Sequence, residues 1–503
     1  MQGTFKEVMG KTSNKSVSYG HHERVAYDLQ ECPTVDQALK RIYDLYNESL
    51  ETIRNNLRGL PDNHDQWERV VYPYVGVTIP SHALNLECQQ SYGVAFESGD
   101  YGITVTAPDH FYRYYEEQLS WIIANHRQPI LVGRSFETIP YPFGAEEELT
   151  KLSDASMSIV KSRPEVWPHL HRVNDDIVDG KSHLWEEGPK PLSLFTAERV
   201  DYSLNRLHHY CGTSVHYFQR YILLTNYQRY IRHFVEYAKN VIHNDDPEAK
   251  LVLPNDIVLD KNHWDDEILD KISHLPQMPA YHLVRSTGEG VTLINIGVGP
   301  SNAKNITDHL AVLRPYVWIM LGHCAGLRPN QTLGDYVLAH SYVRDDHVLD
   351  ESVPLWIPIP ALAEVQVAIQ EATQQVTHCA GIEAKKRLRT GAVISTGNRN
   401  WELHVKDLLP TLNLTRAVGL DMESATLAAN GFRFRVPYGV LLCVSDKPLH
   451  GDIKLKGMAS QFYEKRVKQH MEIGLRSIEI LQETGVDCLN SRKLRSFQEP
   501  LWR

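Results

Sequence analysis

The chain has 503 residues, of which 42% are hydrophobic and 23% charged, as in an ordinary globular protein. This length exceeds the size at which a single hydrophobic core usually stops growing, so we expect at least two domains. The formal net charge of -10 argues against a general binder of nucleic acids or anionic membranes. It leaves room for a local basic pocket that holds a phosphate group.

The cysteines and the first residues indicate the compartment. The seven cysteines are scattered, odd in number and free of any C-x-x-C pair, which is typical of proteins in a reducing environment. The first 20 residues lack the apolar core of a signal peptide, and no later run approaches the roughly 18 apolar residues of a spanning helix. We therefore expect a cytoplasmic protein without a membrane segment.

The first third of the chain has the pattern of an α+β domain. Residues 1 to about 30 are polar, and we predict that they are mobile. Thr34 and Gln37 form a capping-box pattern, and apolar residues at three-to-four spacing predict a helix up to Leu57 that Gly59 closes. Further predicted elements are strands at 69–79, 91–97 and 101–107, the last two as a hairpin, a helix at 111–126 and a strand at 130–132.

The remainder of the chain alternates between strand and helix patterns. We assign residues 31–185 to the N-terminal α+β domain, with 161–190 as a linker or surface excursion, and residues 186–503 to a second domain. Its predicted strands are 217–225, 292–296, 317–321, 334–342, 355–359 and 391–395, and its predicted helices are 197–210, 227–242, 302–313 and 361–378. Residues 244–283 give only weak signals.

The stretch from Ala417 to Asp452 contains two acids at comparable positions of a strand–helix–strand unit. We predict strands at 417–420 and 439–445 and, between them, a helix at 422–429 that Asn430-Gly431 ends. Because loops at the carboxyl ends of parallel strands line one crevice, Glu423 and Asp446 should face it together. Singly, each acid is explained as well by a helix start or a turn.

Glycine-rich turns follow two other predicted strands. Gly297 and Gly299 lie between a strand and a helix, where backbone amides can bind an anion. Gly322 follows the next strand, and Arg328 offers a guanidinium that suits a phosphate or carboxylate. The first turn is not a dinucleotide fingerprint, because Asn302 replaces the third glycine, and no P-loop lysine follows.

The last candidates for a functional site are aromatic and thiol residues. Trp401 follows the strand at 391–395 and could stack on a flat heterocycle, although a tryptophan in that position is more often part of the core. The pairs His323-Cys324 and His378-Cys379 lack the spacing of known metal motifs, so we predict no metal site. Together, the loops after successive strands predict one pocket for an anion, a sugar and a base.

Several longer segments carry a resemblance to a known family. They are GVGPSNAKNITDHLAVLRP, GHCAGLRPNQTLGDYVLAHSYVRDDHVLD, STGNRNWEL, DMESAT and LLCVSDKPLHGDIKL. With these motifs the chain resembles the nucleoside phosphorylase and nucleosidase family over nearly its whole length, except for the first 30 or so residues. The resemblance implies a C-terminal three-layer α/β/α domain with a mixed, largely parallel sheet, so the fold class is α/β.

The resemblance also implies an activity, the hydrolysis of the N-glycosidic bond of AMP to adenine and ribose 5-phosphate. Glu423 with Met422 would hold the ribose hydroxyls, and Asp446 would protonate the purine N7, which turns an anionic leaving group into a neutral one. For the remaining contacts we expect Gly297, Gly299, Gly322 and Arg328 at the phosphate, Trp401 at the adenine, and Asn226, Tyr227 and Arg229 reaching into a neighbouring subunit's pocket.

Regulation and assembly follow only from the resemblance. It implies a hexamer, Mg-ATP as activator, phosphate as inhibitor, and no cofactor for the chemistry itself, with the N-terminal domain as the regulatory part. Two alternatives remain open. A phosphorolytic purine nucleoside phosphorylase would use inorganic phosphate in place of water, and a non-catalytic nucleotide sensor would need no acid at the base.

Overall fold

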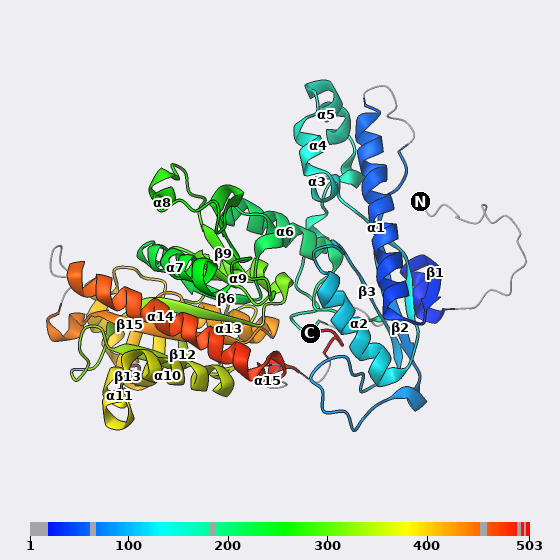
Figure 1. The fold of residues 1–503 in the computed structure, drawn as a ribbon. Helices are drawn as coiled ribbons and strands as arrows, with labels where there is room; N and C mark the ends of the chain where they lie inside the picture. The colour runs from blue at the N-terminus through cyan, green and yellow to red at the C-terminus, as the bar shows by residue number, and fades with distance from the viewer. Residues whose placement is uncertain (1–18, 61–66, 182–187, 453–459, 490–493, 497–498) are drawn as a thin grey trace, which may run out of the picture.

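The computed structural model describes residues 19–60, 67–181, 188–452, 460–489, 494–496 and 499–503. The chain forms two sheets, each covered by its own helices, and the two parts lie side by side (Figure 1). The last residues of the chain lie between them, where the N–H of Trp502 donates to the carbonyl oxygen of Leu192 at 2.8 Å. All seven cysteines are free thiols.

The first sheet has five strands in the order β1-β4-β2-β3-β5. They are β1 (Ala26–Cys32), β2 (Val71–Ile79), β3 (Gly99–Thr104), β4 (Ile130–Thr138) and β5 (Lys190–Pro191), antiparallel except for β3 with β5. The predicted first helix is confirmed as α1 (Val35–Arg58), which begins where Thr34 Oγ1 accepts the N–H of Gln37 at 3.4 Å. Helix α1 packs on β2 and β4, beside α2 (Tyr112–His126). Three short helices follow β4, namely α3 (Tyr141–Gly144), α4 (Glu146–Thr150) and α5 (Asp154–Lys161).

The predicted hairpin between 91–97 and 101–107 is wrong. The partner of β3 is β2, and residues 91–97 form no strand. Gly93 has φ +73°, and its N–H donates to the carbonyl oxygen of Leu501 at 2.7 Å. The N–H of Ala95 donates to His126 Nε2 at 2.9 Å. The backbone donors of this apolar run are thus used by distant residues instead of a strand ladder.

Two expectations about the ends of the first domain also change. Residues 19–30 were expected to be mobile, but they form a 3-10 helix (Gly20–Arg24) and the start of β1, which pairs with β4; residues 1–18 lie outside the described residues. Within the predicted linker, Ile177 and Val178 are buried in the core. The predicted boundary near residue 185 also falls outside the described residues, and β5 beyond it still joins the first sheet.

The second sheet has ten strands in the order β14-β13-β12-β15-β11-β6-β10-β9-β7-β8. They are β6 (Tyr221–Thr225), β7 (Lys250–Leu253), β8 (Ile257–Leu259), β9 (Ala280–Val284), β10 (Val291–Asn295), β11 (Val317–Gly326), β12 (Tyr336–Asp345), β13 (Leu388–Thr396), β14 (Gly419–Asp421) and β15 (Tyr438–Asp446). Strand β14 pairs with β13 and also with β11, so β11 to β15 close into a ring. The weak signals at residues 244–283 did not predict β7, β8 and β9, which the structure shows there.

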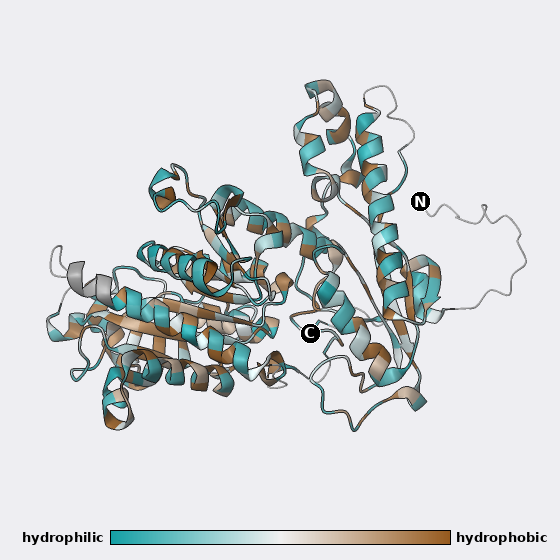
Figure 2. Cartoon of the chain, in the orientation of Figure 1, coloured by the Kyte–Doolittle hydropathy of each residue, from teal (hydrophilic) through white to brown (hydrophobic). Residues whose placement is uncertain are grey.

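Helices cover both faces of this sheet, which confirms the α/β class with a three-layer α/β/α arrangement. On one face α7 (Arg229–Asn240), α10 (Ala363–Thr377) and α14 (Ser460–Thr484) pack together, and on the other α6 (Ala197–Cys211), α9 (Pro300–Leu310) and α13 (Ser424–Phe434) do. Two further helices are α11 (Gly381–Arg387) and α12 (Val405–Thr415), and α8 (Ile268–Lys271) and α15 (Val486–Leu489) are single turns. Figure 2 shows the hydrophobic residues concentrated along the strands.

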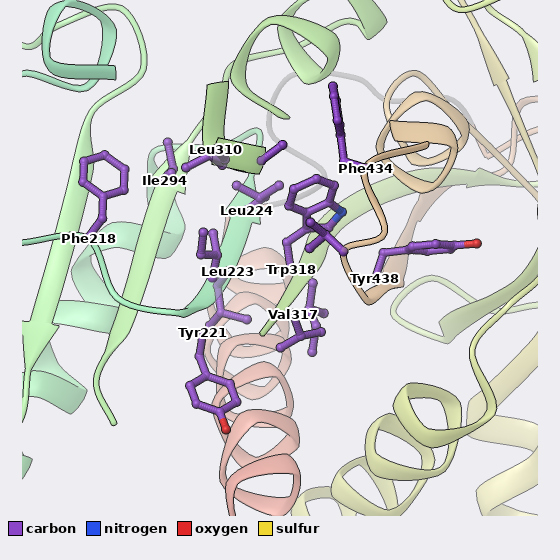
Figure 3. Packing of buried hydrophobic residues seen from close by; sticks show 14 of the residues in the cluster. Phe218, Tyr221, Leu223, Leu224, Ile294, Leu310, Val317, Trp318, Phe434 and Tyr438 are labelled. Atoms are coloured by element: carbon purple, nitrogen blue, oxygen red, sulfur yellow. The ribbon is translucent and has the colours of Figure 1, made fainter. Parts of the chain in front are cut away.

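The centre of the core lies where β6 and β11 run side by side. Trp318 of β11 is fully buried and, in Figure 3, lies between Leu224 of β6 and Phe434 at the end of α13. Every residue of β11 is buried, because the strand has neighbours on both edges and helices on both faces. No helix among the described residues has the length and hydropathy that a membrane-spanning segment requires.

The strand–helix–strand unit at 417–446 differs from its prediction. Strand β14 is not a neighbour of β15 and runs antiparallel to β11, to which β15 is parallel. The run at 355–359 is not a strand: it lies in turns, and Trp356 is 82% exposed. Apolar runs alone fix neither the neighbour nor the direction of a strand.

Helix α13 also continues past its predicted end at Asn430-Gly431. Asn430 is buried, and its Nδ2 donates to Thr307 Oγ1 and Asp308 Oδ1 on α9, both at 2.8 Å. A Cβ on Gly431 would lie 2.3 Å from Cδ1 of Tyr438. Both residues therefore serve close packing of α13 against its neighbours, although as a pair they are typical of a helix end.

An ionic network joins the former linker to the end of α13. Arg433 donates to Asp179 Oδ1 at 2.7 Å, to Asp179 Oδ2 at 3.0 Å and to Asp175 Oδ2 at 3.0 Å. On the other side of Asp175, Arg199 of α6 donates to Oδ1 at 2.9 Å. Arg433 is 7% exposed, so its charge depends on these carboxylates for solvation. The segment at 175–179 is thus fixed to helices α13 and α6.

We predict that Arg433→Met lowers the free energy of unfolding by about 3 kcal/mol, because it leaves Asp179 without its buried partner and Asp175 with Arg199 alone. Chemical denaturation followed by circular dichroism measures the loss. Lys386→Met is the matched control, since it breaks an exposed pair with Glu383 at 2.7 Å that contributes below about 1 kcal/mol. Equal losses for the two variants would contradict the role given to the network.

Candidate active site

Glu423 is a buried carboxylate held by two elements that are distant in the sequence. It is 1% exposed and lies at the start of α13. The N–H of Gly299, at the start of α9, donates to Oε1 at 2.6 Å. Asn226 Nδ2, directly after β6, donates to Oε2 at 3.0 Å. Three segments therefore meet at this side chain, and together they fix its orientation.

A second acid lies two residues before Glu423. Asp421, the last residue of β14, is 4% exposed and accepts hydrogen bonds from Ser395 Oγ at 2.5 Å and from the N–H of Ser424 at 3.0 Å. The hydroxyl of Ser424 donates to it as well. The sequence reasoning missed Asp421, although the D-M-E-S motif contains it. The available signal was an aspartate three residues before a serine at the start of a predicted helix.

Burial shifts the protonation of both acids. Burial raises the pKa of Glu423, and the charge of Asp421 adds to it, while hydrogen bonds from the N–H groups of Gly299 and Met422 and from Asn226 oppose the shift. Burial also raises the pKa of Asp421, against the hydrogen bonds from Ser395 and Ser424. The pair therefore favours fewer negative charges than two exposed carboxylates would carry.

The glycine turn after β10 serves Glu423 directly. Gly297 has φ +70° and Gly299 has φ +120°, a backbone conformation that favours glycine. The N–H of Gly297 donates to Asn295 Oδ1 at 3.1 Å. Because the N–H of Gly299 binds Glu423, neither glycine offers a free amide to an anion in this conformation. Open space lies beside the Gly299 Cα, where a Cβ would meet nothing within 4 Å.

The predicted loop from Gly322 to Arg328 is wrong for most of its length, because β11 continues to Gly326. Gly322 lies inside this strand, opposite Leu442 of β15. A Cβ there would lie 3.1 Å from Leu442 Cδ2 and 3.8 Å from Asn226 Oδ1. Gly322 thus makes room beside Asn226. Arg328 follows the strand, is half-buried, and donates its N–H to Gln331 Oε1 at 2.8 Å.

Asp446 ends β15, opposite Ala325 of β11. It is half-buried, and Ser445 Oγ donates to its Oδ1 at 2.5 Å. Burial raises the pKa of the Cys324 thiol, and the charges of Asp421 and Asp446 both add to this effect. The stretch that ends in Glu423 and the stretch that ends in Asp446 therefore converge near one buried thiol. The raised pKa also argues against Cys324 as a nucleophile.

The other predicted contact residues lie in different surroundings. Trp401 is 6% exposed and packs in an apolar cluster with Leu412 and Leu420, which favours the core interpretation over stacking on a base. Asn226 acts within its own chain, through its bond to Glu423. Tyr227 lies edge-on to His323, with ring centroids 4.7 Å apart.

A cavity lies directly after Asn226 along the chain. Its volume is about 520 Å³, and its lining includes Arg229, Arg232 and Val467. Arg229 is exposed, and its guanidinium carbon lies 5.8 Å from the ring centroid of Tyr227. Within the described residues, no three His, Cys, Asp or Glu side chains form a group that could hold a metal ion.

Comparisons with known proteins identify the class of the fold and the family. The family model of the phosphorylase superfamily matches residues 256–479, so this part of the chain has a nucleoside phosphorylase-like fold. A second model, described as the bacterial AMP nucleoside phosphorylase N-terminus, matches residues 37–189. AMP nucleosidases of Escherichia coli strains K12 and O157:H7 are each 47% identical over 481 residues, which is 93% of this chain and 98% of theirs. The chain belongs to the AMP nucleosidase family.

More distant relatives cover the second domain or part of the chain. A 5'-methylthioadenosine/S-adenosylhomocysteine nucleosidase of Marinomonas sp. strain MWYL1 is 26% identical over 174 residues, 32% of this chain and 70% of that protein. The crystal structure of AMP nucleosidase from Bacteroides thetaiotaomicron VPI-5482 is 28% identical, covers 57% of this chain and 98% of its own, and has a TM-score of 0.41.

We predict that Glu423→Gln becomes more stable relative to the unchanged protein as the pH rises. The unfolded chain ionises Glu423 near its ordinary value of 4.5, but the folded protein keeps the proton to higher pH, so the unchanged protein loses stability in between. Thermal melting at about pH 5 and pH 8 should show a gain for the variant of ~2 kcal/mol.

The glutamine retains the bond from Gly299, and Asn226 Oδ1, which has no partner, can accept from the new amide. Glu402→Gln removes an exposed carboxylate and reports the effect of net charge alone. A stability difference between Glu423→Gln and the unchanged protein that stays constant across this pH range would show that Glu423 is ionised when folded.

Proposed function

We propose that the chain hydrolyses the N-glycosidic bond of AMP to adenine and ribose 5-phosphate. The observation that carries the proposal is Glu423, buried and oriented by Gly299 and Asn226 at the start of a helix in a phosphorylase-superfamily fold. The chain matches the AMP nucleosidases of Escherichia coli over 98% of their length, which supports AMP as the substrate. The product feeds purine nucleotide salvage.

Glu423 acts on the sugar in this proposal, with Met422 beside it. A carboxylate accepts both hydrogens of the ribose diol, and its charge stabilises the positive charge that develops on the sugar as the bond to the base breaks. In the free protein, burial and Asp421 raise the pKa of Glu423. Two hydroxyl donors and a cationic sugar favour the ionised form instead, so this interaction strengthens toward the transition state.

Asp446 acts on the base. A proton from its carboxyl group to the purine N7 makes adenine a neutral leaving group. Ser445 Oγ donates to Asp446 Oδ1, which orients the side chain. Water attacks the anomeric carbon of the sugar as the bond to adenine breaks, which gives ribose 5-phosphate as the second product.

The phosphate end is assigned to basic and glycine residues around the sugar site. The cavity beside Arg229 has room for a phosphate, and Arg328 remains a candidate for the same role. The amides of Gly297 and Gly299 would first have to leave Asn295 and Glu423 to bind an anion. Gly322 contributes by leaving space beside Asn226. Trp401, if it contacts adenine, would need to leave its apolar cluster.

The proposal also covers the assembly of the chain and its regulation. We assign a homo-oligomer, expected to be a hexamer, in the cytoplasm, with Mg-ATP as activator and phosphate as inhibitor. Apolar side chains at the surface of the second domain support an oligomer, because Trp356, Leu403 and Leu414 are 82%, 79% and 83% exposed. The network from Asp175 and Asp179 to α13 supports regulation through the N-terminal part. No cofactor is assigned to the chemistry.

We predict that the purified protein cleaves AMP without inorganic phosphate and releases ribose 5-phosphate, identified by its mass. Hydrolysis follows from AMP as substrate, since the anion-binding residues then hold the 5'-phosphate. The control is adenosine with phosphate. Ribose 1-phosphate from that mixture, with no turnover of AMP, would replace the proposal with the phosphorolytic alternative, and absence of turnover in both would favour the nucleotide sensor.

We predict that Asp446→Asn lowers kcat for AMP by about 10²–10⁴-fold, the usual contribution of a general acid, with a smaller effect on KM. Steady-state kinetics measure both constants. Asp407→Asn, at an exposed position on α12, is the matched control and should retain full activity. Full activity of Asp446→Asn would remove the residue from the role of acid.

A further inference from the structure

Basic side chains gather where the two domains meet, at the amino-terminal edge of the second sheet. Tyr221 begins β6 there, Tyr316 directly precedes β11, and Arg503 comes from the last described residues. Asn226 and Glu423 lie beyond the opposite, carboxyl end of β6. In Figure 3 the hydroxyl of Tyr221 points away from the packed core. This edge is therefore separate from the candidate active site.

Two guanidinium groups share one aromatic ring at this edge. The guanidinium carbon of Arg503 lies 4.5 Å from the ring centroid of Tyr316, and that of Arg220 lies 5.0 Å from it. Arg220 Nη1 also donates to the Tyr316 hydroxyl at 2.6 Å. Contact with an aromatic face stabilises a cation only modestly, by about 0.5–2 kcal/mol. Two like charges on one ring therefore call for a further source of stabilisation.

The position of Arg503 is fixed from both domains. Its backbone oxygen accepts hydrogen bonds from the Tyr114 hydroxyl at 2.8 Å and from Arg314 Nε at 2.7 Å. Its N–H donates to Gln118 Oε1 at 2.7 Å. Tyr114 and Gln118 lie on α2 of the first domain, whereas Arg314 precedes β11 of the second. The backbone of Arg503 is thus anchored to both domains, and its side chain lies against the ring of Tyr316.

Donors at this edge lack acceptors. Among the residues that the structure describes, Nε and Nη2 of Arg503 and the hydroxyl of Tyr221 find no hydrogen-bond partner, although the two residues are 5% and 1% exposed. Buried donors are nearly always paired in folded proteins. Within the described residues neither Arg220 nor Arg503 forms an ion pair, and Glu117 and Glu289 act on this edge only from a distance. Burial and the charges of Arg220 and Arg314 lower the pKa of Arg503.

We propose that Arg220, Tyr221 and Arg503 form a binding site for a phosphoryl group, distinct from the site around Glu423. Arginine has donors and no acceptor, so the ligand must bring several acceptor oxygens, and two cations favour a dianion. Phosphate meets both conditions, whether free or as part of a nucleotide. Arg220 and Tyr316 are half-exposed, and the ligand reaches the edge from their side. The inference stands whether or not AMP is the substrate.

Tyr221→Phe is the sharpest test, because the hydroxyl that it removes makes no hydrogen bond within the protein. Without phosphate, the variant should melt at the temperature of the unchanged protein or slightly above it. With inorganic phosphate, at an ionic strength matched by chloride, the rise in Tm should be smaller than in the unchanged protein. Calorimetric titration should show phosphate affinity weakened several-fold.

Arg220→Gln provides a second, independent variant at a half-exposed position. It should weaken phosphate binding by about tenfold, the loss expected for a charge-assisted contact, and Arg58→Gln, at the exposed end of α1, should leave it unchanged. Titration of both variants with AMP and ATP distinguishes the source of the phosphoryl group. A nucleotide whose affinity falls in both variants identifies the ligand as that nucleotide, and phosphate alone responding identifies the free anion.

Phosphate that binds near Glu423 would raise the Tm of all these proteins equally, so it does not affect the comparison between them. Phosphate responses of Tyr221→Phe and Arg220→Gln that match the unchanged protein would overturn the proposal. A lack of any response to phosphate, AMP or ATP in the unchanged protein would overturn it as well. Loss of the response in both variants, with Arg58→Gln unaffected, supports it.

Discussion

The candidate site depends on one buried carboxylate and its two donors. Glu423 accepts from Gly299 and from Asn226, so the starts of α9 and α13 and the end of β6 must meet at one point. Burial of an acid is unfavourable unless hydrogen bonds compensate for lost hydration. The glycine conformation at Gly299 and the space left by Gly322 both serve this contact. A ribose diol bound to Glu423 would donate the hydrogen bonds that water donates to an exposed carboxylate.

The same two helices connect the site to the first domain. Helices α9 and α13 begin at the groups that surround Glu423, and near their other ends Asn430 joins them through Thr307 and Asp308. Arg433, one turn further on α13, binds Asp175 and Asp179. The segment at 175–179 is therefore connected through α13 to the helix start that carries the carboxylate. This gives the proposed regulation by the N-terminal part a physical route, which the Arg433 variant probes.

The proposed phosphoryl site lies at the other edge of the same sheet, where α2 and the last residues of the chain meet β6 and β11. Its occupant would neutralise Arg220 and Arg503 and so strengthen the contact between the domains. Two anion-binding regions at opposite edges would give one chain both a substrate site and a site that reports phosphate. The region at Arg220 and Arg503 is recognised by positive charges that no described protein group compensates, and the region at Glu423 by a buried carboxylate.

The sequence by itself determined the α/β class, the helix at 35–58, the existence of most strands, and the two acids, because these depend on local periodicity and on motifs such as D-M-E-S and S-D-x-P. Only the tertiary structure decided which strands are neighbours: β14 pairs with β13 and β11 instead of β15. It also decided that Gly322 lies inside a strand, that Asn430-Gly431 continues a helix, and that Asp421 and Asn226 belong to the site. These outcomes depend on burial and on partners distant in the chain, which no local pattern records.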